Sequence, residues 1–274
     1  MTNFLKMKNL QRNNRRRPNE KFLSGLERRL AARTRRVFKK QLNYIVEAVK
    51  EMPQFQGEPQ TNSIDGDINN MLNGMPGQEE LAEQIVGVSK VGVDRGGKYI
   101  VKELDLGKFG VSWSLQNTAA IKFLGGKLSY ELSNFKGNIT GTTKKNISKI
   151  ILDAVEKGES YNKTAKKIMA QGEAGVFSKA RAQMIAVRES GVAYEKGKEI
   201  VLQDFSNKYP EVKTQKKWQT VNDKNVTPTH TLNQEQGSDD GWIAVTDVFL
   251  GTNDMVAPAS DNPRCRCFTK YRII

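Results

Sequence analysis

The sequence predicts an α+β protein, with a long amphipathic basic helix near the N-terminus, a largely helical middle and a small mixed α/β unit at the C-terminus. Two observations predict this class. Apolar residues recur at helical spacing over residues 20–51 and again over 140–205. After Pro210 that pattern ends, residues 216–221 have the composition of a strand, and the remaining chain is rich in turns with short strands.

The first element is a basic arm followed by a helix, and the two together occupy residues 1–51. The arm ends at Pro18, Asn19 is placed to cap the helix, and Pro53 ends it. The apolar positions that define the inner face of this helix are Phe22, Leu26, Leu30, Val37, Leu42, Ile45 and Val49. Because Arg and Lys occupy the other face, we expect one side buried and the other charged.

The middle of the chain is harder to assign. Residues 52–78 are expected to be a flexible linker, because Gly, Pro, Asn, Gln and Ser dominate them and none is Lys or Arg. Residues 79–139 form a mixed region. There we expect a short helix over 79–91, glycine-punctuated segments with a strand at 99–101, and a helix over 113–124.

The last region, residues 140–274, is expected to begin with three helices. The first ends at Gly158, the second is capped by Ser160 and ends at Gly172, and the third runs over about 178–205. The strand at 216–221 and the turn-rich segments complete this region. It therefore contains both the helical and the strand components of the predicted α+β fold.

Positive charge is concentrated at the N-terminus. The chain has 44 Lys and Arg against 30 Asp and Glu, for a net charge of +14. The first fifty residues carry +12 of this, and the other 224 residues carry only +2. No apolar run approaches the roughly 18 residues of a membrane span, and the N-terminus has no apolar signal core. We therefore expect a soluble protein without a membrane partner, whose anionic partner meets the N-terminal segment.

The basic segment has three interpretations: a solvated helix face, a site for an acidic protein surface, and a site for nucleic acid. The density of unneutralised like charges argues against the first, because such charges repel one another along a helix. Residues 5–21 contain no aromatic residue, so binding to double-stranded DNA would use phosphate contacts without sequence reading. The candidate DNA-binding side chains are Arg12, Arg15, Arg16, Arg17, Arg28, Arg29, Arg33, Arg35, Arg36, Lys39 and Lys40.

The residues with metal-binding potential lie near the end of the chain. His230 is the single histidine, and Cys265 and Cys267 are the two cysteines. One imidazole and two thiolates supply three of the four positions of a tetrahedral structural zinc site. Asp223, Asp261 or water would supply the fourth, and Asp223 is our chosen candidate. The spacing matches no common zinc finger, so small buried cysteines and a locally bonded histidine remain an alternative interpretation.

The C-terminal half resembles the Mu F-like minor head proteins of tailed phages, also called head morphogenesis proteins. One part of the resemblance is the helix AQMIAVRES at residues 182–190, which contains Glu189. The rest is an ordered set of residues, of which the last two form a Cys-Arg-Cys sequence. This set is Trp218, Thr220, Asp223, Val226, His230, Pro258, Asp261, Cys265 and Cys267.

The resemblance implies a structural protein packaged in a few copies inside the procapsid and associated with the portal, first in the host cytoplasm and then in the virion. It also implies that Asp223, His230, Cys265 and Cys267 cluster in one small α+β unit. In some relatives the protein travels with the DNA at ejection. The alternative function is a small metal-dependent nuclease or other hydrolase that uses His230 and Asp223, and a cluster of several carboxylates would favour it.

Overall fold

The structure is a computed structural model that describes residues 17–56, 63–132, 138–224, 226–237, 240–258 and 261–274. The chain divides into two compact units. Unit 1 combines residues 1–27, 87–124 and 184–274, and unit 2 combines 28–86 and 125–183. Since each unit joins separate stretches of the chain, neither unit coincides with one of the four contiguous regions expected from the sequence.

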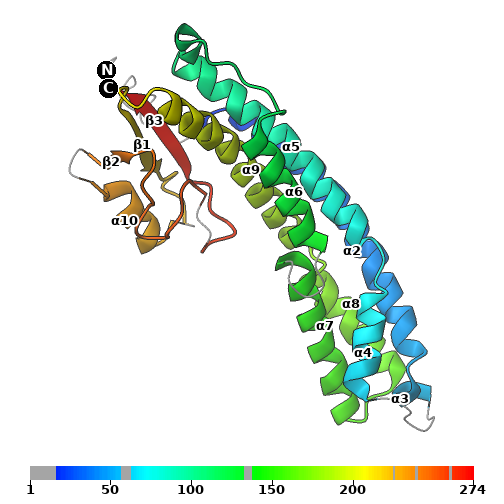
Figure 1. The fold of residues 1–274 in the computed structure, drawn as a ribbon. Coiled ribbons are helices and arrows are strands. Elements are labelled where there is room, and N and C mark those ends of the chain that lie inside the picture. The colour runs from blue at the N-terminus through cyan, green and yellow to red at the C-terminus, as the bar shows by residue number, and fades with distance from the viewer. Residues whose placement is uncertain (1–16, 57–62, 133–137, 225, 238–239, 259–260) are drawn as a thin grey trace, which may run out of the picture. The chain divides into compact units, whose positions relative to one another are not determined.

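The described elements are mostly helices, drawn in Figure 1, with a small sheet near the C-terminus. The long helices α2, α5, α6 and α9 each contribute a segment to both units. The helices are α2 (Glu20–Lys50), α3 (Pro53–Gln56), α4 (Ile64–Asn73), α5 (Gln78–Glu103), the 3-10 helix η1 (Leu106–Phe109), α6 (Thr118–Leu132), α7 (Asn138–Glu156), α8 (Tyr161–Ala174), α9 (Lys179–Lys208) and α10 (Pro228–Glu235). The strands are β1 (Thr214–Gln219), β2 (Trp242–Ala244) and β3 (Phe268–Ile273). The predicted α+β class is thereby confirmed, together with the long N-terminal helix.

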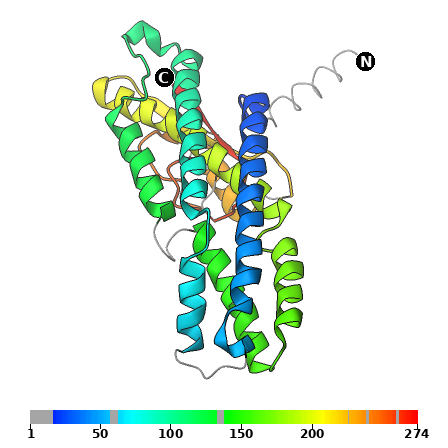
Figure 2. The ribbon, with the colours of Figure 1, turned by 90° about the vertical axis from the view of Figure 1, so that its right-hand side faces the viewer.

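Unit 2 is built from helices, with α4, α7 and α8 beside the second part of α2 (Figure 2). The predicted inner face of α2 is buried, with Leu30, Val37 and Ile45 fully enclosed. Phe38 on α2 meets Phe177 edge-on with ring centroids 5.7 Å apart. Such edge-to-face pairs are favoured by the ring quadrupoles.

The expected linker contains two helices, α3 and α4. Ile68, Met71 and Leu72 recur at helical spacing on α4 and are buried, and α4 packs on α7. Ser63 caps α4, because its hydroxyl accepts a hydrogen bond from the amide of Gly66. Three apolar side chains in ten residues suffice to bury one face of the helix, although the composition of the whole segment is polar.

Two expectations for the middle region were wrong. Residues 99–101 lie inside α5 and form no strand, and α5 continues far beyond residue 91. The reason is the glycines, which we interpreted as breaks in the helix. In α5, Gly92 and Gly96 are contact positions for α9: a Cβ built on Gly96 would lie 1.9 Å from the carbonyl oxygen of Tyr194. The glycines therefore allow two helix backbones to approach each other closely.

The start of α2 also differs in detail from the expected cap. Asn19 precedes the helix with a φ of 56°, in the left-handed region, whereas a capping residue has an extended backbone. Its side-chain amide donates a hydrogen bond of 2.8 Å to the hydroxyl oxygen of Tyr194 on α9. Within unit 1, Asn19 thus anchors the beginning of α2 to α9.

The sheet in unit 1 is antiparallel in the order β2-β1-β3. In the central strand β1, the side chains of Thr214, Lys216 and Trp218 alternate with partly exposed ones and are buried. Behind β3, the ammonium of Lys198 on α9 is fully enclosed and donates to both carboxylate oxygens of Glu195 and to the carbonyl of Thr269. This saturated ion pair fixes α9 to the sheet.

Candidate metal centre

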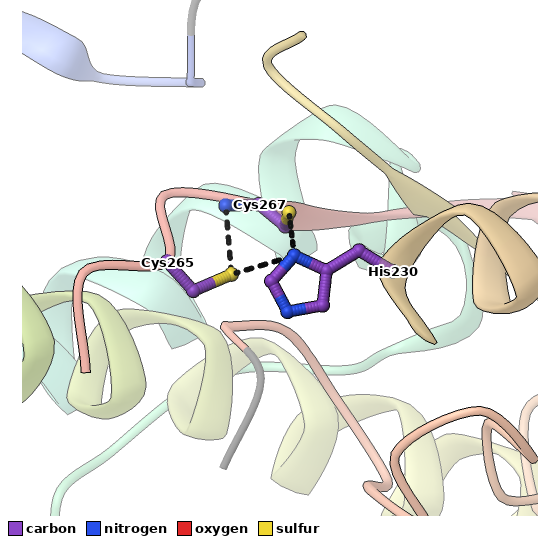
Figure 3. A group of neighbouring side chains, drawn as sticks. All are labelled: His230, Cys265 and Cys267. Carbon is purple, nitrogen blue, oxygen red and sulfur yellow. Dashed lines mark hydrogen bonds between the residues drawn. The ribbon is translucent and has the colours of Figure 1, made fainter. Parts of the chain in front are cut away.

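Two elements of unit 1 bring the two cysteines and the histidine together. His230 lies in the first turn of α10, and Cys265 and Cys267 lie on the segment that leads into β3 (Figure 3). All three are buried, with 0% of the His230 surface and 2% of each cysteine exposed. Each therefore contributes one donor atom to a common interior point, as the sequence predicted for these three residues.

The donor atoms face one another at short range. The Nδ1 atom of His230 lies 3.7 Å from the Sγ of Cys267 and 4.0 Å from the Sγ of Cys265 (Figure 3). All three donor atoms lie within 4.8 Å of one another. The backbone amide of Cys267 donates to the sulfur of Cys265 at 3.4 Å, and such a bond stabilises a thiolate.

The orientation of the imidazole is set from its other side. The Nε2 atom of His230 lies 3.2 Å from Oδ1 of Asp261, and Thr229 donates to Oδ2 of the same carboxylate. A carboxylate at Nε2 favours the proton on that nitrogen, and the lone pair of Nδ1 then points at the two sulfurs. Metal-bound histidines commonly have such a carboxylate partner on the second nitrogen.

The first turn of α10 also restrains the histidine. Thr227 is the N-cap, Pro228 occupies the first turn, and Thr227 and His230 form a capping box. This local sequence explains why His230 points inward at the start of the helix. The tilted ring of Trp218 lies beside it, with centroids 5.9 Å apart.

The thiol of Cys267 is electrostatically perturbed. Its pKa is raised well above the ordinary value, first by the neighbouring Cys265 and then by burial. The indole of Trp218 and the backbone amide of Val221 act in the opposite direction, because their N–H groups stabilise the thiolate. Two adjacent buried sulfurs resist holding two negative charges unless a cation lies between them.

The apolar surroundings of the donors are those of a structural site. Trp218, Ile243, Phe249 and Ala257 form one buried cluster with the two cysteines. Trp218 and Phe249 meet edge-on at 5.1 Å. The ammonium of Lys216 lies over the Phe249 ring and donates to the carbonyl of Met255, and burial lowers its pKa to about 8.

The carboxylates predicted near the site differ in their positions. Asp261 lies on the Nε2 side of His230, opposite the sulfurs, and it therefore orients the imidazole ring without being a donor of the cluster. Asp223 is absent from the donor cluster found among the described residues, and its role as fourth ligand stays a prediction. That cluster, within the same described part, contains no carboxylate, and the hydrolase alternative stays a prediction.

The other residues of the sequence motif join β1, α10 and α9. Thr220 is buried at the end of β1, and its hydroxyl donates to Oε1 of Gln234 on α10 at 2.7 Å. Glu189 is buried on α9. The sequence analysis missed Gln234 and Phe249, because neither residue type at its position has a spacing that signals a contact with a distant strand.

The predicted DNA-binding residues separate into three groups. Arg12, Arg15 and Arg16 lie outside the described residues. Arg17 is buried, and its guanidinium pairs with Glu20 at 2.9 Å and Glu27 at 2.7 Å, so its inclusion was wrong. The third group is exposed along α2 and consists of Arg28, Arg29, Arg33, Arg35, Arg36, Lys39 and Lys40.

Taken together, a small antiparallel sheet, one short helix and an enclosed His-Cys-Cys cluster define the C-terminal part of unit 1 as a compact α+β domain with a candidate structural metal centre. Comparison with protein families then identifies it. Residues 145–270 match the family described as Phage Mu protein F like protein, so this part of the chain is similar to the Mu F-like proteins and is called the Mu F-like domain below.

The family match confirms the resemblance seen in the sequence. No curated protein and no solved structure showed significant similarity to the chain. Among the described residues, no helix is long and apolar enough to span a bilayer.

Proposed function

We propose that this protein is a minor component of a tailed-phage head, which joins the procapsid interior, docks on the portal and contacts packaged DNA without reading its sequence. The Mu F-like domain supports assignment to the phage head. The exposed cations of α2 support the DNA contact. The protein acts in this proposal as a structural component and not as an enzyme.

The seven exposed cations of α2 make one continuous basic face. From Arg28 to Lys40 they span twelve helical steps, about 18 Å at 1.5 Å per residue. At 100° per residue they fall on one side of the helix, and the buried side chains, such as Leu30 and Val37, fall on the other. Of these seven, only Lys40 has an ion pair among the described residues, with Glu80. An unneutralised row of this kind matches a phosphate backbone.

Neutralising this face should weaken DNA binding and its salt dependence together. If about six phosphates are contacted, the logarithm of the binding constant should fall with the logarithm of salt concentration at a slope near −5. Replacing Arg28, Arg29, Arg33, Arg35 and Arg36 with Gln should reduce the slope to about −1, because Gln keeps the helix propensity but releases no counterions. Fluorescence anisotropy with two unrelated duplexes of equal length measures both quantities.

A matched control removes five exposed lysines elsewhere. Lys90, Lys122, Lys145, Lys149 and Lys166 are exposed, and their replacement with Gln lowers the net charge equally. This variant should keep most of the salt slope. Equal losses in the two variants would show that binding follows net charge alone, and the α2 face would then have no special role.

The portal contact calls for a separate measurement. Coexpressed with the portal protein of its own phage, the full chain should copurify with it, and the variant with five Gln substitutions on α2 should copurify equally well. Loss of copurification in this variant would mean that the α2 cations meet an acidic protein surface instead of DNA. Absence of copurification for the natural chain would contradict portal docking.

We also propose that His230, Cys265 and Cys267 hold one structural zinc ion. Two thiolates and an imidazole are donors that zinc prefers, and the enclosed apolar surroundings match a structural role. The ion would supply the positive charge that two adjacent buried thiolates require. Among the described residues, the segment before β3 has few large apolar side chains, so a metal link between α10 and β3 would add order to it.

A further inference from the structure

One stretch of this basic protein is strongly acidic. Residues 220–262, which include α10 and β2, contain a single Lys and no Arg. Its seven acidic residues are Asp223, Glu235, Asp239, Asp240, Asp247, Asp254 and Asp261. A net charge of −6 in 43 residues contrasts with the +14 of the whole chain. This stretch lies in the Mu F-like domain and has a different electrostatic character from α2.

Within this acidic stretch two leucines are exposed to solvent. Leu232 on α10 is 60% exposed, and Leu250 in the turn after β2 is 76% exposed, the highest value among the exposed large apolar side chains described. Glu235 lies one helical turn after Leu232, and Asp247 lies three residues before Leu250; both are exposed. We call these four residues the leucine face.

The two leucines are held close together by a rigid frame. Gln236 accepts a hydrogen bond from the amide of Leu250 at 2.7 Å and donates to the carbonyl of Val248 at 2.9 Å. Asn233 accepts from the amide of Gly251 at 2.7 Å. A Cβ built on Gly251 would lie 3.2 Å from the Cβ of Leu232, so the turn rests directly on α10. Rigid presentation of exposed apolar groups lowers the entropy cost of binding.

We propose that the leucine face is the docking site of this chain's own N-terminal arm, residues 1–16. The arm has the complementary sequence. It contains no acid, and its apolar residues are interspersed with basic ones. The apolar residues are Met1, Phe4, Leu5, Met7 and Leu10, and the basic residues are Lys6, Lys8, Arg12, Arg15 and Arg16. A charge of +5 on the arm is complementary to Glu235 and Asp247, the two exposed acids of the leucine face.

The attachment of the arm favours its own domain over a second molecule. Arg17 follows the arm directly and is buried in ion pairs with Glu20 and Glu27 in unit 1, and Glu27 lies 3.9 Å from Arg266 next to the cysteines. Sixteen extended residues span about 50 Å. The radius of gyration of a compact unit of roughly 150 residues is about 15 Å. The tether therefore reaches the leucine face and gives a millimolar effective concentration.

This inference is independent of DNA binding by α2. The proposed DNA contact uses cations from Arg28 to Lys40, whereas the arm ends before Arg17. The proposed docking on the leucine face assigns the cations of the arm to an intramolecular contact. A failure of one proposal therefore leaves the other standing.

Trypsin cleavage of the arm tests the contact in the full chain. In the natural protein, cleavage after Arg12 should be slow, because a docked arm does not enter the protease. Leu232→Ser with Leu250→Ser, and separately Glu235→Lys with Asp247→Lys, should each raise the cleavage rate about tenfold, which corresponds to about 1.4 kcal/mol. All four side chains are exposed, so the fold should survive, and unchanged thermal melting verifies this.

Matched controls and a rescue variant make the result specific. Ile121→Ser removes an exposed apolar side chain elsewhere, and Glu83→Lys with Glu211→Lys reverses two exposed acids elsewhere; neither should change the rate. Lys6→Glu with Lys8→Glu should restore slow cleavage after Arg12 in the Glu235→Lys, Asp247→Lys background. Equally fast cleavage in all variants would overturn the proposal, and so would protection that grows with protein concentration, which indicates a second copy as the occupant.

Discussion

Replacing His230 with Ala should abolish zinc binding and lower the free energy of unfolding by about 4 kcal/mol, which corresponds to roughly 10 °C in melting temperature for a chain of this size. The natural protein should contain about one equivalent of zinc. The reason is the convergence of His230 Nδ1 with two buried sulfurs, which can both be thiolates only with a cation between them. Elemental analysis and thermal unfolding measure the two effects.

Two further variants separate loss of metal from loss of packing. Cys267→Ser is nearly isosteric, so a large loss of stability would come from the lost ligand and not from a cavity. Asp261→Asn keeps all three donors but removes the carboxylate behind the imidazole, and it should weaken zinc affinity about 10- to 100-fold at unchanged stoichiometry. A chelator should lower the melting temperature of the natural protein and leave that of His230→Ala unchanged.

A protein without bound metal would contradict the zinc proposal. If the purified protein contains no metal and Cys267→Ser melts at the natural temperature, the cysteines are small buried residues of the core. His230 would then be held by Asp261 and the capping box alone. That outcome would leave the family assignment and the DNA proposal intact, because neither depends on the three donors.

The candidate site could be predicted in composition but not in geometry. A single histidine and a Cys-x-Cys pair are visible in any reading of the sequence, and the structure brings them within 4.8 Å. The choice between Asp223 and Asp261 depends on where the loops after β1 and before β3 lie. Their glycines, prolines and polar residues have no periodicity that fixes a position. The three donors could therefore be predicted from the sequence, whereas the position of Asp261 at Nε2 of His230 follows from long-range packing.

The fold could be predicted from the sequence where apolar residues recur at the regular spacing of a helix or a strand. Helices α2, α7, α8 and α9 and strand β1 have such patterns and were found within a few residues. The environment of Arg17 could not be predicted in this way. The number of charged residues in a segment does not reveal that Arg17 forms an ion pair with the buried Glu27, ten residues later. The glycines of α5 show a second limit. Intrinsic propensity counts each of them as a break, whereas helix packing can require them.

A second large effect of a single residue on folding is expected at Gly96. Gly96→Ala should lower the free energy of unfolding by about 3 kcal/mol or more, since the added methyl would lie 1.9 Å from the carbonyl oxygen of Tyr194 and 2.9 Å from its carbonyl carbon. These are backbone atoms of α9, so no rotamer change relieves the overlap. The opposite side of the same contact is similar, because a Cβ on Gly197 would lie 2.1 Å from the carbonyl oxygen of Val93.

Gly87→Ala is the matched control, because it makes the same chemical change in the same helix. A Cβ at Gly87 has no atom within 4 Å, so the substitution should raise the free energy of unfolding by about 0.5–1 kcal/mol through helix propensity alone. Denaturant titration of the two variants with a common slope gives the comparison. A stabilising Gly96→Ala would show that α5 and α9 do not approach through this glycine, and the explanation for the unbroken α5 helix would have to come from elsewhere in its sequence.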